Sequence, residues 1–184
     1  MTRELESVDP SPGKRSSLQP ECGRCCGLCC VAPALAAGPD FAIDKEAGRP
    51  CPNLTEDFRC SIHQRLRAEG FRGCVAYDCF GAGQKVTQIT FQGRSWRQSP
   101  EVAAEMFDVF GVVRQLHSML VYLGQALELE PARRLYGELR AKRDELERRS
   151  LDGSEALQQL DVAVHRAEVD DLLLRVSALV RARA

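Results

Sequence analysis

The chain has 184 residues, of which 28% are charged and 44% hydrophobic, and its formal net charge is −1. These values are typical of a soluble globular protein with one domain or two small ones. A charge this close to neutral offers no basic surface to nucleic acid, and no apolar run approaches the roughly 20 residues that span a bilayer. We therefore expect no nucleic-acid partner and no membrane partner, and leave a protein partner open.

The first 21 residues contain the segment DPSPGKRSSLQPE, which is rich in proline and serine and poor in large apolar side chains. Such a composition predicts a disordered N-terminal tail over residues 1–21. The segment LCCVAPALAAG after Arg24 imitates a signal peptide, but Pro33 interrupts its apolar run and cleavage there would remove five of the nine cysteines. We therefore expect a cytoplasmic location.

Cysteines are the most informative residues of the chain. Their number is odd and no export signal is seen, so clustered thiols favour metal binding or redox chemistry over structural disulfides. Buried free thiols would explain one or two cysteines but not five within nine residues. The sequence makes all nine cysteines candidate metal ligands: Cys22, Cys25, Cys26, Cys29, Cys30, Cys51, Cys60, Cys74 and Cys79.

The segment CGRCCGLCC, residues 22–30, contains two overlapping pairs with the spacing that lets two cysteines reach one ion, Cys22/Cys25 and Cys26/Cys29. The adjacent cysteines are harder to place, because neighbouring side chains normally diverge. Four ligands fill one zinc site or one iron–sulfur cluster, and eight fill two and leave one thiol over. The cofactor is predicted to be zinc or an iron–sulfur cluster, and both the metal and the number of sites stay open.

Residues 22–98 hold every cysteine, and glycines interrupt this part of the chain repeatedly. We expect a small irregular cysteine-rich metal-binding module in which the metal supplies much of the folding free energy. Two short elements stand out: a helix over 61–70 that ends at Gly70, and a strand or hairpin arm over 85–93. His63 lies three residues after Cys60, and the two form a candidate mixed ligand pair.

From residue 99 the pattern becomes helical. Ser99 and Pro100 are suited to the N-cap and first turn of a helix. Its apolar residues alternate at spacings of four and three, which predicts a buried helix about four heptads long. The residues of this apolar seam are Val102, Met106, Val109, Val113, Leu116, Leu120, Leu123 and Leu127.

A second helix is expected to begin at Pro131, with a buried side formed by Leu135, Leu139 and Leu146. A third is expected over about 154–182, where Asp152 and Glu155 have the spacing of a capping box. Residues 99–184 are thus predicted to be a three-helix antiparallel unit, and the whole chain a mostly α protein. The predicted buried side of the third helix consists of Leu157, Leu160, Val164, Leu172, Val176 and Leu179.

The segment CCGLCC followed by CPNLTEDFRCSIHQRLRAEGFRGC resembles the CxxCxxCC cysteine-cluster family, which is described as zinc- or iron-chelating. The likeness covers about residues 22–80, with His63 at a position where that family usually has tyrosine. The longer segment over 40–96 also resembles the N-terminal module of actinobacterial pentapeptide-repeat proteins, although no such repeat occurs in these 184 residues. The resemblance implies metal chelation and no established reaction.

The leading functional hypothesis is metal binding by clustered cysteines, as a structural or redox element of an interaction protein. An iron–sulfur enzyme for redox or group-transfer chemistry is the alternative, because some relatives in the wider cysteine-cluster group resemble enzymes of that kind. A redox-sensing regulator is a third option. The sequence shows no acid–base constellation beside the cysteines, so whether the protein is an enzyme stays open.

Overall fold

The structure is a computed structural model that describes residues 18–183. Most of the predicted disordered tail, residues 1–17, lies outside the described residues. The prediction of a mostly α protein is confirmed, because helices form most of the regular structure in residues 18–183. Within that range, β pairing is limited to two isolated antiparallel bridges, Leu35–Lys45 and Leu54–Cys60.

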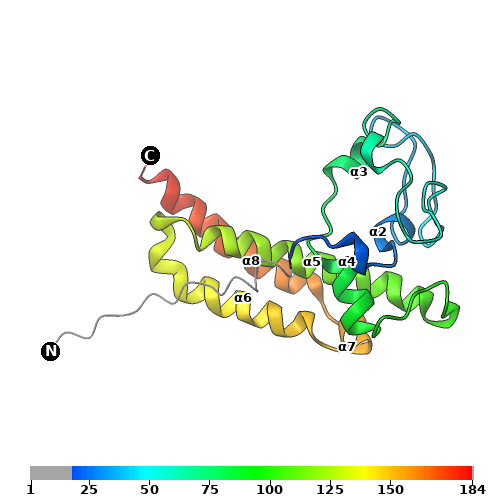
Figure 1. The fold of residues 1–184 in the computed structure, drawn as a ribbon. Helices are drawn as coiled ribbons and strands as arrows, with labels where there is room; N and C mark the ends of the chain where they lie inside the picture. The colour runs from blue at the N-terminus through cyan, green and yellow to red at the C-terminus, as the bar shows by residue number, and fades with distance from the viewer. Residues whose placement is uncertain (1–17, 184) are drawn as a thin grey trace.

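The helical body, which we define as residues 82–183, is built around one long helix, α5. Helix α5 packs against three later helices and also contacts the short elements α4 and η3 that precede it. It therefore occupies the centre of the body, with the other helices around it (Figure 1). The helices from residue 100 onward are η4 (Pro100–Val102), α5 (Ala103–Ala126), η5 (Glu130–Leu135), α6 (Tyr136–Ser150), α7 (Ser154–Gln158) and α8 (Val162–Arg181).

The apolar seam predicted for α5 forms the core of the body. Six of its eight residues are buried, and only the two end residues, Val102 and Leu127, are partly exposed. The predicted buried side of the second helix is also confirmed, since Leu135, Leu139 and Leu146 are all buried. Burial of such an apolar stripe is the main stabilising contribution in a helical bundle.

The third predicted helix is interrupted, and the expectation of one continuous helix over 154–182 is wrong. The chain leaves the helical conformation between α7 and α8, and Asp161 then caps α8 by accepting hydrogen bonds from the N–H groups of Ala163 and Val164. Restarting the helix changes its rotational phase, so Val164 is 51% exposed instead of buried. The predicted capping box is also absent, because the N-cap of α7 is Gly153 and no side chain caps it.

The strand predicted over 85–93 is wrong as well. The short helix α4 (Ala82–Gln84) continues into a π-helical turn, η3 (Lys85–Thr90). In this turn the Phe91 N–H donates to the Val86 carbonyl at 3.0 Å, which brings both residues to the side that faces the core. Burial of these two side chains overrides the local preference of β-branched residues for strands.

Residues 22–81 form a lobe that we call the cysteine lobe, whose first residues Cys26, Leu28 and Val31 pack into the core of the body. It rises beside the N-terminal half of α5, whereas the C-terminus lies at the opposite end of the body (Figure 1). The helix predicted over 61–70 shrinks to a single 3-10 turn followed by further turns, although Gly70 does end it with a φ of 80°. The helices of the lobe are η1 (Cys22–Arg24), α2 (Leu28–Val31), η2 (His63–Arg65) and α3 (Arg72–Ala76).

Trp96 joins the lobe to the body. Its indole N–H donates to the Cys26 carbonyl at 2.8 Å, and its ring makes edge contacts with Phe58 of the lobe and Phe107 of α5. The neighbouring Arg97 lies over the rings of Phe58 and Trp96 and donates to the carbonyl of Thr55 at 3.0 Å. These contacts fix the position of the cysteine lobe relative to α5.

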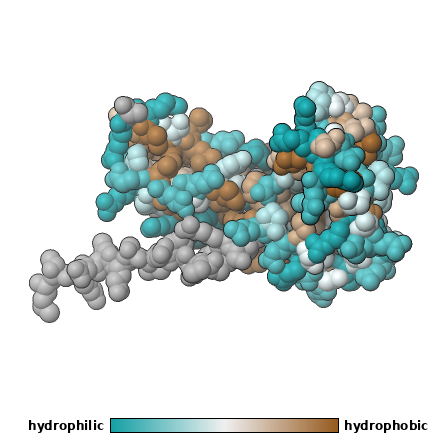
Figure 2. All heavy atoms as spheres, turned by 45° about the horizontal axis from the view of Figure 1, so that its top comes forward, coloured by the Kyte–Doolittle hydropathy of each residue, from teal (hydrophilic) through white to brown (hydrophobic). Residues whose placement is uncertain are grey.

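The surface shown in Figure 2 is largely hydrophilic over the cysteine lobe. Hydrophobic residues gather over the end of the body that carries the C-terminus, at the left of the view, and smaller hydrophobic areas are visible over the top of the lobe at the right. No helix in the described residues combines the length and the apolar character that a membrane span requires.

Candidate metal centre

The cysteines fall into two groups in space. The first cysteine group consists of Cys22, Cys25, Cys29 and Cys79. Burial and then the neighbouring thiols of Cys26 and Cys79 raise the pKa of Cys25 to about 11. Burial, Asp78 and Cys22 raise the pKa of Cys79, and both Cys25 and Cys79 act on Cys29. Since thiolates influence one another's pKa only at short range, these four side chains surround a common region.

The second cysteine group consists of Cys30, Cys51, Cys60 and Cys74. Burial and then the thiols of Cys30, Cys51 and Cys60 raise the pKa of Cys74 to about 11. Burial, Cys30 and Cys51 likewise raise the pKa of Cys60. A backbone hydrogen bond of 2.9 Å from the Cys51 N–H to the Cys30 carbonyl brings the second half of this group to the first.

Cys26 also acts on the pKa of Cys25, but its side chain is part of the hydrophobic core, and we therefore assign it to neither group. It is 2% exposed, and its sulfur lies 3.3 Å from the Thr87 hydroxyl and 3.6 Å from the Met106 sulfur. Burial is the main cause that raises its pKa, so the neutral thiol is favoured. This environment is typical of a thiol that packs as a small hydrophobic residue, and it favours that role over the ligand role predicted from the sequence.

The adjacent cysteines Cys29 and Cys30 connect the two groups. Their sulfur atoms are 4.0 Å apart. A hydrogen bond between them, together with burial, raises the pKa of Cys29, while the same bond and the charge of Lys45 lower the pKa of Cys30 to about 7. The two groups are therefore neighbours, with one member of the pair assigned to each.

Backbone N–H groups point at several of the sulfur atoms. Cys25 receives hydrogen bonds from the N–H groups of Leu28 and Gly27, Cys79 from two glycine N–H groups, and Cys60 from Ile62. Each of these bonds lowers the pKa of the thiol that accepts it, because it stabilises the thiolate. Such donors suit sulfurs that bind metal, since the thiolate is the ligand form.

The elements that hold the first group approach one another closely. A Cβ atom added to Gly83 would lie 2.5 Å from the Cys25 sulfur, so a side chain at this position would displace the thiol. Gly81, with a φ of 74°, turns the chain from Cys79 into α4 and thereby brings Gly83 to that place. Glycine is thus required here for the close approach of Cys25 to the start of α4.

The sulfur atoms are more widely spaced than a single zinc ion requires. Around a single tetrahedral zinc ion, where each Zn–S bond is about 2.3 Å long, the four sulfur atoms lie about 3.8 Å from one another. Among the described residues, no three cysteine sulfurs lie within 4.8 Å of one another. A single zinc ion would have to draw the thiols together, whereas a four-iron cluster takes each thiolate on a separate iron atom and spreads them further apart.

A different group of side chains has the spacing of a metal site. One ligand atom from each of Glu145, His165 and Glu168 lies within 4.8 Å of the others. The ammonium group of Lys142 lies among them, 3.1 Å from Glu145 and 3.0 Å from the His165 ring, with Glu168 as a further partner. Because this ammonium already supplies the positive charge, the arrangement is that of a half-buried ion-pair network between α6 and α8.

The other two histidines, His63 and His117, make no direct contact with a cysteine thiol among the described residues. His63, the candidate partner of Cys60, is exposed. His117 is 4% exposed and contacts the Phe80 carbonyl through Nδ1 at 2.6 Å. The structure therefore brings neither of these two histidines into a cysteine group by a direct contact.

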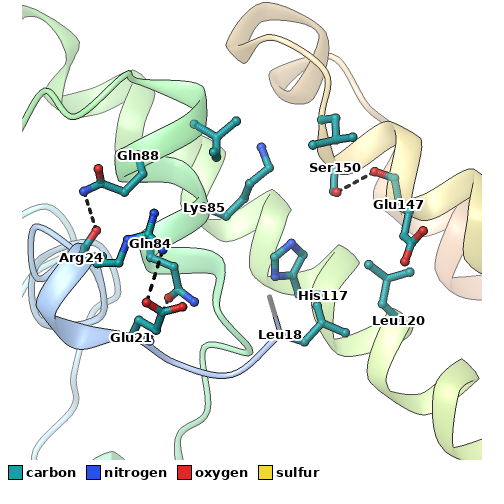
Figure 3. A pocket seen from close by; sticks show the side chains of 12 residues that line it. Leu18, Glu21, Arg24, Gln84, Lys85, Gln88, His117, Leu120, Glu147 and Ser150 are labelled. Carbon is teal, nitrogen blue, oxygen red and sulfur yellow. Dashed lines mark hydrogen bonds and ion pairs between the residues drawn. The ribbon is translucent and has the colours of Figure 1, made fainter. Parts of the chain in front are cut away.

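A cavity of about 310 Å³ lies between the start of the cysteine lobe and the body. Figure 3 shows His117 and Lys85 directed toward its interior. The Lys85 ammonium contacts the Thr90 hydroxyl at 3.3 Å, and no carboxylate lies within 4.0 Å of it in the part of the chain that is described. Burial lowers the pKa of both Lys85 and His117. The cavity thus contains a poorly solvated cation, and the carboxylates of Glu21 and Glu147 line it as well.

Comparisons with known proteins give one relative of undetermined role. The chain is 53% identical over 167 residues to YybG of Bacillus subtilis (strain 168), which is described as an uncharacterized protein. The match covers 91% of this chain and 60% of that protein, so the chain spans less than two thirds of its relative. No protein-family model and no solved structure matches. The resemblance to the cysteine-cluster family and to pentapeptide-repeat proteins stays a prediction.

The sequence did not point to Lys45. Lys45 stands between Asp44 and Glu46 in the chain, 15 residues after Cys30 and six before Cys51. In the fold its side chain is buried and its charge acts on Cys30. A lysine flanked by two acidic residues is ordinarily part of a solvated surface, so its burial could not be predicted from the sequence.

Proposed function

We propose that this chain is a metal-binding protein that holds two iron–sulfur clusters, one in each cysteine group. The observation that carries the proposal is the division of nine cysteines into two groups of four, with Cys26 left in the hydrophobic core. Four thiolates complete one iron–sulfur cluster, so the division matches the ligand count of two clusters. The nine cysteines and their partial burial support metal binding in general.

The choice of iron–sulfur clusters over zinc rests on spacing and on donor type. Thiolates are the preferred ligands of both. The wide separation of the sulfur atoms favours a centre with several metal atoms. The N–H groups that donate to Cys25, Cys60 and Cys79 fit this assignment, because hydrogen bonds to sulfur tune the reduction potential of such clusters.

The adjacent cysteines support a role in electron transfer. In bacterial two-cluster ferredoxins, cysteines of one continuous run are divided between the two clusters. Cys29 and Cys30 have the same relation, because each contributes to a different group and their sulfurs lie 4.0 Å apart. Two clusters connected in this way exchange electrons, so we propose a redox element of an interaction protein as the leading function.

A second candidate is an enzyme that depends on one of these clusters. The cavity of about 310 Å³ favours it, because Arg24 on its wall lies next to Cys25 in the chain and Lys85 lies two residues after Gly83, which contacts Cys25. A ligand in this cavity would therefore be near the first cysteine group. The test is the melting temperature of the wild-type protein and of Lys85→Met with and without small carboxylates. An increase in the wild-type protein alone would support this candidate, and no effect on either protein would contradict it.

Anaerobic purification with metal analysis tests the leading proposal. We expect a brown protein with equal amounts of iron and acid-labile sulfide. Replacing Cys25 and Cys79 with serine, or Cys60 and Cys74 with serine, is expected to halve the iron content, because each pair belongs to one group. The matched control Cys26→Ala is expected to keep both clusters.

Three outcomes would contradict the proposal in different ways. A colourless protein with stoichiometric zinc would show that the sites bind zinc and not iron–sulfur clusters. Loss of all iron from either double variant would show that the cysteines form one centre and not two. Loss of iron from Cys26→Ala with its helices intact, as measured by circular dichroism, would make Cys26 a ligand and contradict the division into two groups.

A further inference from the structure

The ammonium group of Lys45 is buried without a counter-ion. Lys45 is 8% exposed, and the structure gives its Nζ atom only backbone partners. No carboxylate lies within 4.0 Å of this atom among residues 18–183. Its partners are the carbonyl oxygens of Pro33 at 2.5 Å, Arg49 at 2.8 Å, Glu46 at 3.0 Å and Val31 at 3.1 Å.

These carbonyl groups satisfy the hydrogen bonds of the ammonium but do not neutralise its charge. A buried charge is strongly unfavourable unless an opposite charge lies near it. The pairing of Lys45 with Leu35 through two backbone hydrogen bonds of 2.8 and 2.9 Å holds the lysine firmly in this place. The fold therefore maintains a fixed positive charge in the cysteine lobe, with backbone carbonyl groups and no carboxylate within 4.0 Å of it in residues 18–183.

The position of this charge identifies its partner. Val31 follows Cys30 in the chain, and Arg49 precedes Cys51 by two residues, so the carbonyl groups around Lys45 belong to the segments that carry these two ligands. The same segments are joined by the hydrogen bond from the Cys51 N–H to the Cys30 carbonyl. In agreement, burial lowers the pKa of Lys45, while Cys51 and Cys30 act against that shift.

The first cysteine group has the opposite surroundings. The charged neighbour that most affects Cys79 is the Asp78 carboxylate, which raises the pKa of that thiol. The charge next to Cys25 in the chain, that of Arg24, is paired with the Glu21 carboxylate at 3.4 Å. Arg114 is close to this region, but its guanidinium lies over the Tyr77 ring and donates to the Asp78 carbonyl. The two groups are thus electrostatically unequal.

We propose that Lys45 is the internal counter-cation of the second cysteine group, which makes the metal centre held by Cys30, Cys51, Cys60 and Cys74 the more easily reduced of the two. This inference rests on the proposed function. A metal centre with four thiolates carries net negative charge, and reduction adds one more. A fixed positive charge nearby stabilises the reduced form more than the oxidised form.

The test compares two single-cluster proteins made from the full chain. Cys25→Ser with Cys79→Ser keeps the second cluster, and Cys60→Ser with Cys74→Ser keeps the first. Redox titration followed by electron paramagnetic resonance gives the reduction potential of each cluster. With Lys45 intact, we expect the second cluster to have the higher reduction potential. The expected difference is at least about 59 mV, which for one electron is a tenfold change in the ratio of reduced to oxidised protein. Equal or reversed potentials would overturn the proposal.

Substitution of Lys45 then separates charge from structure. Lys45→Gln keeps hydrogen-bond donors without the charge. We expect it to lower the reduction potential of the second cluster, so that the ratio of reduced to oxidised protein falls about tenfold, and to leave the first cluster unchanged. Lys45→Arg keeps the charge and is expected to retain most of the wild-type potential. An arginine variant that behaves like the glutamine variant, or a glutamine variant that shifts both clusters equally, would overturn the proposal.

Failure of the proposed function gives a different result. If neither single-cluster protein contains iron, the iron–sulfur assignment itself is wrong. If both contain zinc, the role of Lys45 is measured by the rate of zinc release to a chelator. Lys45→Gln is then expected to accelerate release from the second group about tenfold and not from the first, and equal acceleration in both would overturn the inference about Lys45.

Discussion

The cysteine lobe and the helical body obtain their stability in different ways. In the body, helices contribute long rows of buried aliphatic side chains, from Met106 to Leu123 in α5 and at Leu139 and Leu146 in α6. Between residues 32 and 80 of the lobe, the buried apolar residues are Cys51, Leu54, Ile62 and Phe71, and none of them joins the main core.

This difference shows what the cysteines contribute. A segment of this length with so few buried apolar side chains does not offset the loss of conformational entropy on folding. Under the proposed function, clustered thiolates that share a metal centre would supply the missing free energy, in the same way as in small metal-dependent domains. The lobe is thus expected to depend on metal for its structure, whereas the body is expected to fold through its hydrophobic core.

Metal removal is expected to have the largest effect and would separate the two regions. Treatment with a chelator under anaerobic reducing conditions should unfold the lobe, because each lost centre removes stabilisation on the order of 10 kcal/mol. Hydrogen exchange resolved along the chain should show loss of protection in residues 32–80 and retention in α5 and α6. Equal protection of the lobe before and after metal removal would contradict the comparison.

A cavity in the body is expected to have the converse effect. Leu139 is fully buried between α6 and α5, and Leu139→Ala should lower the free energy of unfolding of the body by about 2–5 kcal/mol. Leu174, which is 68% exposed, provides the matched control Leu174→Ala, with little effect expected. Urea unfolding followed by circular dichroism measures both, and metal content should be unchanged. Loss of metal in Leu139→Ala at urea concentrations that leave its helices folded would count against independent stabilisation.

A steric change within the lobe is expected to have an intermediate effect. A Cβ atom at Gly73 would lie 2.3 Å from the Phe41 ring, so Gly73→Ala must displace Phe41 and disturb the adjacent Cys74. We expect destabilisation of about 1–3 kcal/mol in the lobe and faster metal release from the second group. Gly38→Ala is the control in the same lobe, because nothing lies within 4 Å of its added Cβ. Equal release rates for the two variants would show that the contact with Phe41 does not support the site.

The smallest expected effect is a pH dependence of the body. Burial lowers the pKa of His117 from its ordinary value of 6.5, so the folded state favours the neutral ring. The unfolded state then binds a proton more readily, and the stability of the body should fall as pH decreases through 6.5 toward the lower folded pKa. His117→Gln should make the urea midpoint less sensitive between pH 7 and pH 5. An unchanged slope in this variant would assign the acid sensitivity to other groups.

Much of the helical body could be predicted from the sequence, because apolar spacing in α5 and α6 directly gives the buried face of a helix. Predictions failed where tertiary packing or a local cap decided the outcome. The β-branched residues around Val86 form a π-helical turn because Val86 and Phe91 are buried against α5. The break before α8 depends on the Asp161 cap, a local signal that the continuous apolar pattern concealed.

The sequence by itself predicted the kind of chemistry and the ligand type, since five cysteines within nine residues favour metal binding. It also predicted that the adjacent cysteines would diverge. Only the tertiary structure decided that Cys29 and Cys30 belong to different groups, that Cys26 lies in the core, and that Lys45 stands beside the second group. The reason is physical: these assignments depend on where Cys51, Cys60, Cys74 and Cys79 arrive in space, and distance along the chain does not determine that.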